Sequence, residues 1–155
     1  LNLPQINLGV DSFELRIWHG LALAEPRSLV ILSYTDSSWH LTGTNYWISY
    51  ENKYPKEGIL ILDSFVTKKL IVPLPFSDII DSIETFRLGT FPSQHEVPGF
   101  QDNVADGMFY TIELATSKYY KAINYNNPKF YSDPYNQKIT RFLSFLQTIG
   151  VHTIY

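Results

Sequence analysis

The sequence predicts an α+β fold: a mainly antiparallel sheet of about six to eight strands, a short middle helix, and a C-terminal amphipathic helix packed on one face. Three observations lead to this prediction. Short runs of alternating or β-branched apolar residues fill most of the chain and are separated by turn residues. Only two segments space their apolar residues as a helix does. Strands also arrive in runs without helices alternating between them, which favours antiparallel pairing.

The first strands are expected near the N-terminus. Residues 13–17 alternate strictly between apolar and charged side chains, as in a half-buried strand. Residues 29–32 form a short β-branched run that is typical of a central strand. After turn residues at 36–38, a further strand begins near Trp39. Residues 42–45 then allow a turn or bulge before residues 46–50, so a hairpin is the simplest interpretation.

The middle of the chain predicts two more strands and the shorter helix. Residues 59–62 and 65–72 are apolar runs that follow a polar loop. Ser77 and Asp78 are suitable caps for a helix of about three turns, which Gly89 would close. Residues 89–107 then form a loop that is long for a compact domain, and such loops are often functional.

A hairpin and the longer helix are predicted at the end of the chain. Residues 107–114 alternate, and residues 119–125 should return as the partner strand. Asp133 and Pro134 are the residues expected at a helix N-cap and first turn. The apolar stripe of this helix is followed by Gly150, a suitable C-terminal cap. The stripe consists of Ile139, Phe142, Leu143, Leu146 and Ile149.

The composition is that of a globular protein. The chain has 155 residues, of which 45% are apolar and 17% charged, too apolar for disorder and too interrupted by polar residues for a membrane span. One core should suffice, so residues 1–155 are expected to form a single domain. Because there is no cysteine, disulfides and thiolate chemistry are excluded. The start of the chain carries no signal-peptide pattern, so both a cytoplasmic location and export after signal removal remain open.

Nucleic acid is not an expected partner. The net charge is −3, and no basic run is longer than Lys68 and Lys69, so there is no electrostatic footprint for phosphates. No cofactor is predicted. The four histidines form no metal-ligand pattern, and His19 and His40 are expected at a sheet edge beside tryptophans. No serine lies in a nucleophile elbow.

Acidic residues gather in one part of the chain. Residues 89–117 contain four acidic residues and no lysine or arginine, whereas the rest of the chain is nearly balanced. The oxygen atoms of Glu96, Asp102, Asn103 and Asp106 could bind a cation, and the loop could face a basic partner, but the spacing does not match an EF-hand loop. A solvated loop is the simpler interpretation.

Aromatic residues suggest a second surface. The chain has 11 tyrosines, 10 phenylalanines and three tryptophans, and such side chains provide rigid contacts for proteins or sugars when exposed. Those that lie opposite the apolar positions or in loops are expected to be exposed: Trp18, Trp47, Tyr50, Tyr54, Tyr120, Tyr131 and Tyr135.

The predicted hairpin that begins near residue 107 shows a sequence pattern that resembles other domains. Asp106, Gly107, Tyr110 and Glu113 form a D-G-x-x-Y-x-x-E pattern before the final helix. This layout resembles bacterial α+β domains of uncharacterised function, and it implies the fold without a catalytic role. Gly107 also has a local explanation, a turn in which glycine tolerates a positive φ.

These observations favour a non-enzymatic module that binds another protein or a sugar. The expected binding residues are Trp47, Tyr54, His95, Glu96, Asp102 and Asp106. The alternative is a small hydrolase or cation-dependent enzyme that uses the acidic loop of residues 89–107.

Overall fold

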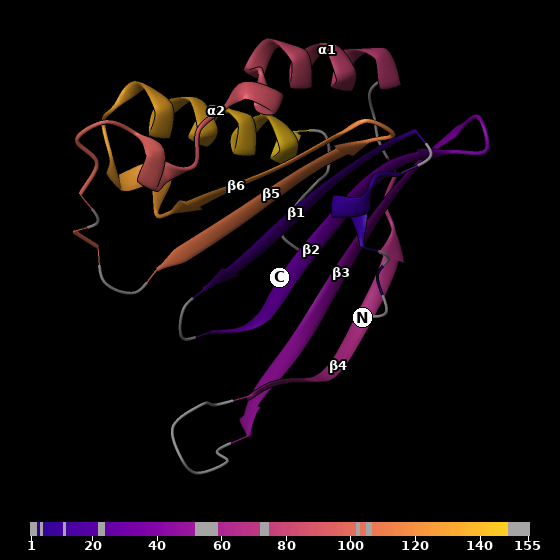
Figure 1. Ribbon diagram of the computed structural model, residues 1–155. Helices are drawn as coiled ribbons and strands as arrows, with labels where there is room; N and C mark the ends of the chain where they lie inside the picture. Colours follow the sequence, from indigo (N-terminus) through magenta and orange to yellow (C-terminus); the bar gives the residue numbers. More distant parts are fainter. Residues whose placement is uncertain are drawn as a thin grey trace.

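The computed structural model describes residues 3, 5–10, 12–21, 24–51, 59–71, 75–101, 103–104 and 107–148. Six strands, two α-helices and four short 3₁₀ helices follow one another in this part of the chain (Figure 1). Their order is η1 (Ile6–Leu8), β1 (Phe13–Leu21), β2 (Ala24–Thr35), β3 (Ser38–Glu51), β4 (Ile59–Lys69), α1 (Phe76–Phe86), η2 (Leu88–Thr90), η3 (Gln94–Glu96), β5 (Met108–Thr116), β6 (Tyr119–Asn126), η4 (Pro128–Phe130) and α2 (Pro134–Thr148).

All six strands belong to one sheet in the order β4-β3-β2-β1-β5-β6, and every neighbouring pair is antiparallel. Both α-helices cover the same face of this sheet (Figure 1). The α+β class, the antiparallel sheet and the position of the two helices are therefore confirmed. None of the helices in the described ranges is long and apolar enough to cross a membrane.

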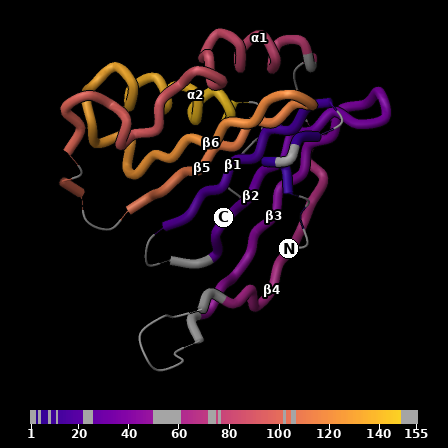
Figure 2. Tube along the Cα trace, in the orientation of Figure 1, coloured from indigo at the N-terminus to yellow at the C-terminus, as the bar shows by residue number. Residues whose placement is uncertain are grey.

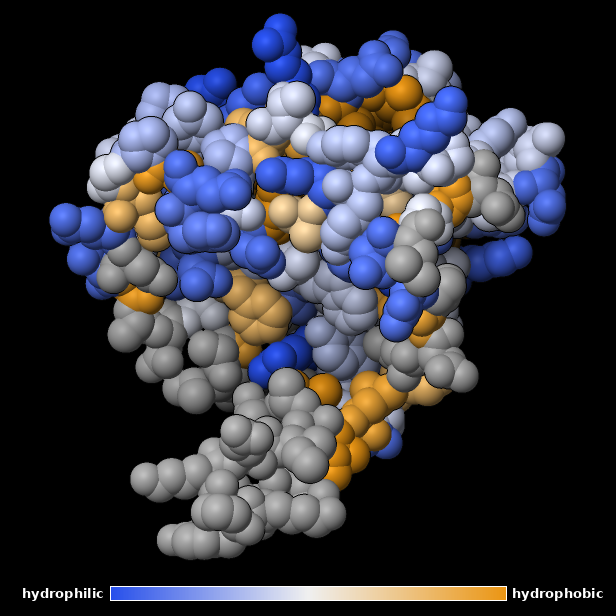
Figure 3. Space-filling view, viewed as in Figure 1, coloured by the Kyte–Doolittle hydropathy of each residue, from blue (hydrophilic) through white to orange (hydrophobic). Residues whose placement is uncertain are grey.

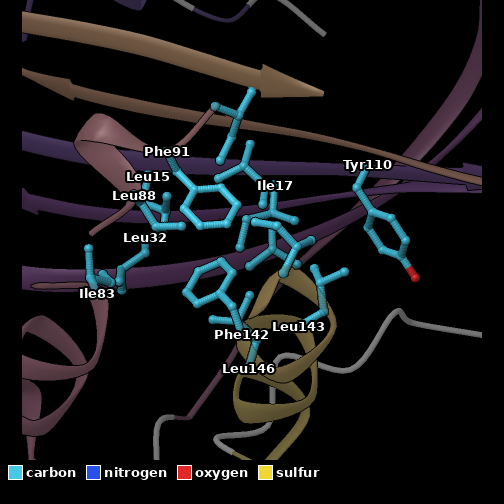
Figure 4. Close-up of a cluster of buried hydrophobic side chains, with 14 of the residues drawn as sticks. Leu15, Ile17, Leu32, Ile83, Leu88, Phe91, Tyr110, Phe142, Leu143 and Leu146 are labelled. Carbon is cyan, nitrogen blue, oxygen red and sulfur yellow. The ribbon is translucent and has the colours of Figure 1, made fainter. Parts of the chain in front are cut away.

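The core lies between the sheet and the helices. Leu15 and Ile17 of β1 point to the helix-bearing face, and Phe142 of α2 is fully buried against this face (Figure 4). Burial of such a side chain stabilises a fold by about 1.5 to 3 kcal/mol. The cluster takes residues from β1, β2, β5 and β6 but only Leu41 from β3 and none from β4 among the described side chains. The helix layer thus leaves one end of the sheet uncovered.

Two strand predictions are wrong. Residues 39–50 do not form a hairpin, because β3 runs without reversal through Gly43, which pairs with Val30 on one side and Lys68 on the other. The β-branched Thr44 continues the strand and exchanges a 2.8 Å hydroxyl hydrogen bond with Thr67. Residues 59–69 are likewise a single strand, in which the register shift beside Ser64 marks a bulge rather than a break.

The helix boundaries are partly as expected. For α2 the N-cap is confirmed, since Asp133 Oδ1 accepts the backbone N–H groups of Tyr135 and Asn136, both at 3.0 Å. The N-cap of α1 is Pro75, so Ser77 and Asp78 lie inside the first turn. Gly89 does not close α1, because Arg87 already adopts the left-handed conformation, with φ 54°. Gly150 and Ile149 lie outside the described residues.

Gly107 has a different role from the one expected. The described glycines with positive φ are Gly9 and Gly99, whereas Gly107 is needed for a close approach. A Cβ atom there would lie 1.9 Å from Asn127 Oδ1, which accepts the backbone N–H of Met108 at 2.8 Å. The glycine therefore lets the start of β5 contact the residue that follows β6.

Candidate functional site

The described residues 87–101, which follow α1, have a defined structure with two short 3₁₀ helices. This segment passes alongside α2 before the chain reaches β5 (Figure 2). Its centre is η3, which is fixed by a capping box: the Ser93 backbone N–H donates to Glu96 Oε2 at 2.7 Å, and the Ser93 side chain accepts in return from the N3 backbone. Ser93 Oγ also accepts the backbone N–H of Asn124 in β6 at 3.2 Å.

Gln94 attaches this segment to the edge of the sheet. Its Oε1 accepts the backbone N–H of Asn126 at 2.8 Å, and its Nε2 donates to the Asn126 carbonyl at 2.9 Å. The side-chain amide therefore pairs with β6 as a neighbouring strand would. Gln94 Nε2 donates also to Asn136 Oδ1 of α2 at 2.6 Å, and the two side chains are 4% and 0% exposed. Loop, sheet edge and helix are thus joined by buried amides.

Asp133 extends this network to the surface. In addition to its N-cap bonds, its Oδ2 accepts a 2.6 Å hydrogen bond from Asn136 Nδ2. Burial alone would raise the pKa of Asp133, but the hydrogen bonds from Asn136 and Tyr135 outweigh burial and lower it. The carboxylate stays charged at the N-terminus of α2, where the helix dipole also favours it.

A hollow of about 300 Å³ opens between this loop and the residues that precede α2. Phe100 and Tyr131 form an edge-to-face pair in its wall, with ring centres 5.0 Å apart. The Asn103 backbone N–H donates to the Tyr131 hydroxyl at 3.3 Å. The full lining is Val97, Pro98, Gly99, Phe100, Gln101, Asn103, Tyr131, Ser132 and Asp133.

Two further hollows continue along α2. One of about 240 Å³ shares Tyr131 with the first, and one of about 320 Å³ shares Gln137 and Arg141 with the second. We call the region formed by these three adjacent hollows the α2 surface. Its first part carries Asp133, and its other charged residues are basic: Lys129, Lys138 and Arg141. The charge of the α2 surface therefore changes from negative at its first part to positive along the rest of its length.

The sequence-predicted site residues do not come together. His95 and Glu96 are exposed on η3, beside β6, whereas Trp47 is half-buried on β3 at the other side of the sheet. Glu96 serves the capping box and lies 3.9 Å from Lys121 Nζ. Tyr54, Asp102 and Asp106 lie outside the described residues. Within the described ranges, no three His, Asp or Glu side chains form a group that could hold a metal ion.

The expectation that His19 lies at a sheet edge is wrong. It lies on the central strand β1, 4% exposed, and stacks on Tyr110 with ring centres 4.8 Å apart. Burial, and then the positive charge of Lys129, lowers its pKa to about 4. The adjoining cavity, which Ser28 and Tyr110 also line, has only about 30 Å³. It holds no more than a few water molecules and is too small for a substrate.

The helix-free face carries a second polar cluster. Glu113 accepts hydrogen bonds on both carboxylate oxygens, from Trp18 Nε1 at 2.6 Å and from the Tyr120 hydroxyl at 2.8 Å. The prediction that Trp18 and Tyr120 are exposed is therefore wrong, because both are half-buried and hydrogen-bonded to Glu113. Tyr131, also predicted to be exposed, is half-buried as well. Tyr135 is 38% exposed, as expected. The side chains of Tyr50 and Tyr54 fall outside the described part.

Sequence reasoning missed most residues of the α2 surface. Gln137 and Arg141 occupy ordinary polar positions of an amphipathic helix, and only their spacing opposite the apolar stripe could have indicated them. Comparison with family models, curated proteins and solved structures gives no match. The resemblance to bacterial α+β domains therefore stays a prediction.

Proposed function

We propose that this chain is a non-enzymatic protein-binding module, and that the α2 surface receives an extended segment of its partner. The observation that carries the proposal is that three neighbouring hollows follow α2 and share lining residues, from Phe100 and Tyr131 at one end to Arg141 at the other. Concave surfaces with a few aromatic and polar groups are the usual sites of recognition.

Rigidity supports this proposal. The first hollow is built by a loop that the buried amides of Gln94 and Asn136 fasten to β6 and α2. A loop that is already ordered loses little conformational entropy when a partner binds. Phe100 and Tyr131 add large contact area with few rotatable bonds.

The charged residues of the α2 surface indicate what kind of segment the partner would offer. Lys129 and Arg141 are exposed on the middle and far parts of the α2 surface, and Lys138 lies above the Phe91 ring at 5.5 Å. The Asp133 carboxylate already accepts three hydrogen bonds from Tyr135 and Asn136 at the start of α2. We therefore expect a segment with an acidic stretch, which would face the basic residues, next to an apolar or aromatic residue that would enter the hollow beside Tyr131.

A phage-displayed library of random twelve-residue peptides tests the proposal. Selection is run in parallel on the wild-type chain, on Arg141→Glu, and on Lys118→Glu, which makes the same charge change in the exposed turn between β5 and β6. Synthetic copies of the enriched peptides are then titrated by fluorescence anisotropy.

Enriched peptides should be acidic, should bind the wild-type and Lys118→Glu chains equally, and should lose at least about tenfold in affinity for Arg141→Glu. Circular dichroism checks that the variants are folded. Equal affinity for Arg141→Glu, or no enriched family together with binding on a glycan array, would overturn the proposal in favour of another surface or a sugar ligand.

A further inference from the structure

The two edge strands of the sheet differ in whether other parts of the chain bond their outward-facing backbone groups. At β6, the side chains of Ser93 and Gln94 occupy the backbone groups of Asn124 and Asn126 that would otherwise attract a further strand. At the opposite edge, β4 pairs with β3 and with no other strand in the described part of the chain, and residues 61 and 63–69 are all exposed. Among the described residues, the β6 edge is therefore closed by the chain itself, whereas the β4 edge is open.

The open edge carries exposed apolar side chains on both faces, between polar and charged ones. Ile61 is 39% exposed, Phe65 52% and Val66 51%. The helix layer does not cover them, since no described β4 side chain belongs to the core. Hydrophobic residues are visible in Figure 3 at the place that β4 has in Figure 1. A long, exposed, apolar edge is a template for pairing with another strand.

The same edge carries features that restrict pairing. The bulge beside Ser64 interrupts the regular ladder, and Lys68 and Lys69 place charges near its end. Such features protect edge strands from indiscriminate association. A partner must therefore accommodate the bulge and offer an acidic group at the correct position.

The backbone register defines which groups face outward. The Leu70 backbone N–H donates to the Leu41 carbonyl at 3.0 Å, and bonded pairs alternate along an antiparallel ladder. Val66 and Lys68, which lie an even number of residues from Leu70, therefore direct their backbone groups to β3. Phe65 and Thr67 direct theirs away from the sheet.

We propose that a second copy of this chain pairs with this edge, β4 against β4 and antiparallel, about a two-fold axis that passes beside Val66. The two Val66 side chains would then face each other. Phe65 would pair with Thr67 of the partner subunit through the outward-facing backbone groups, and the two sheets would become continuous. A two-fold contact of this kind is the commonest symmetry of soluble oligomers.

Charge complementarity selects the second copy as the occupant. Asp63 accepts a 2.7 Å hydrogen bond from Ser49 Oγ, which puts its carboxylate on the helix-bearing face, where Val66 and Lys68 also lie. In the proposed register Ser64 pairs with Lys68 of the partner subunit, so that this lysine comes next to Asp63. The symmetry repeats the contact, so each Asp63 meets a lysine.

The oligomeric state in solution tests the proposal. Sedimentation equilibrium over a range of protein concentrations should give a dimer, with twice the 17.9 kDa of one chain. Lys68→Glu puts like charges together at both contacts and should weaken dimerisation at least about tenfold, whereas Lys118→Glu should leave it unchanged. Val66→Asp places two carboxylates face to face at the axis and should abolish it.

A charge exchange makes the test specific to the register. Asp63→Lys alone should also be monomeric, because it faces Lys68 of the partner subunit. An equimolar mixture of Asp63→Lys and Lys68→Glu should form a heterodimer, since both contacts then join opposite charges. Circular dichroism confirms that each variant is folded.

A wild-type chain that stays monomeric at the highest concentration overturns the proposal, and so does a dimer that survives both Lys68→Glu and Val66→Asp. If the two charge variants fail to associate when mixed, the register is wrong. These outcomes do not depend on peptide binding at the α2 surface.

Discussion

Gln94 and Asn136 are 42 residues apart in the chain, yet the Gln94 Nε2 group donates a 2.6 Å hydrogen bond to Asn136 Oδ1 in the buried interior. The same Gln94 amide also bonds both backbone groups of Asn126. One side chain therefore holds the loop, the β6 edge and the start of α2 in a fixed relation.

Gln94→Ala should destabilise the fold by about 1 to 3 kcal/mol, because it leaves buried donors and acceptors without their partner. Urea unfolding followed by circular dichroism measures the change. Gln101→Ala, an exposed amide in the same loop, is the control and should stay within about 0.5 kcal/mol of wild type. Equal effects of the two substitutions would show that the buried amide has no special role.

Gly107→Ala should cost about 1 to 3 kcal/mol, because its Cβ atom would displace the Asn127 side chain that accepts the Met108 N–H. Gly89→Ala is the control, since its Cβ atom would meet the Tyr119 hydroxyl at an ordinary 3.6 Å. Adding Asn127→Gly removes the clash and suits the left-handed φ of 49° at that position, so part of the loss should be recovered. Thermal unfolding of the three variants checks this order.

Stability should fall as the pH is lowered from about 6.5 to 4. The pKa of His19 is lowered to about 4 in the folded chain, so in this window the unfolded chain binds a proton that the folded chain does not. The contribution of neutral His19 to the free energy of unfolding is fully present above pH 6.5. Its loss at low pH amounts to about 3 kcal/mol at most. Urea titrations at pH 7 and pH 5 measure it. His19→Gln should flatten the dependence, and a dependence unchanged in His19→Gln contradicts the assignment.

Glu113→Gln should lower the pKa of Tyr120. Burial, and then the hydrogen bond to Glu113 and its negative charge, raise that pKa to about 12, with Arg16 opposing them. A phenol with a raised pKa supports the fold below pH 10, and this support is lost as the pH rises through 12. NMR titration of ¹³C-labelled tyrosine, with Tyr120→Phe for assignment, follows the change. Glu84→Gln on the exposed side of α1 should leave the Tyr120 titration as it is.

The parts of the fold that local chemistry specifies were predictable. Strands β1 and β5 and the Asp133 cap of α2 appear where the sequence indicates them. The prediction that β1 is half-buried is wrong, because Arg16, on the face opposite Leu15 and Ile17, is only 5% exposed. The continuity of β3 was not predictable, because a glycine flanked by threonines is also typical of a turn, and only pairing on both sides keeps Gly43 in a strand. The end of α1 was not predictable for a related reason. Arg87 adopts a positive φ there, and few residues other than glycine do so.

The candidate site was less predictable than the fold. Its first hollow depends on amides such as Gln94, whose partners lie far away in the chain and carry no sequence motif. The cluster of acidic residues pointed to residues 89–107, of which residues 97–101 and Asn103 line the first hollow of the α2 surface. The basic wall, with Lys129 and Arg141, arises only when the helix packs beside that loop.

The strand order has a consequence for synthesis of the chain on the ribosome. The meander from β1 to β4 is translated first, but β1 is central in the finished sheet and pairs on its second side with β5. Until β5 emerges, the nascent sheet has two open borders, one at β1 and one at β4. Addition of β5 depends on contacts far apart in sequence, such as Trp18 with Glu113, and pairing of this kind is slow. A ribosome stalled before Met108 would therefore hold an aggregation-prone half-sheet, and chaperones that shield strand borders would act in that interval.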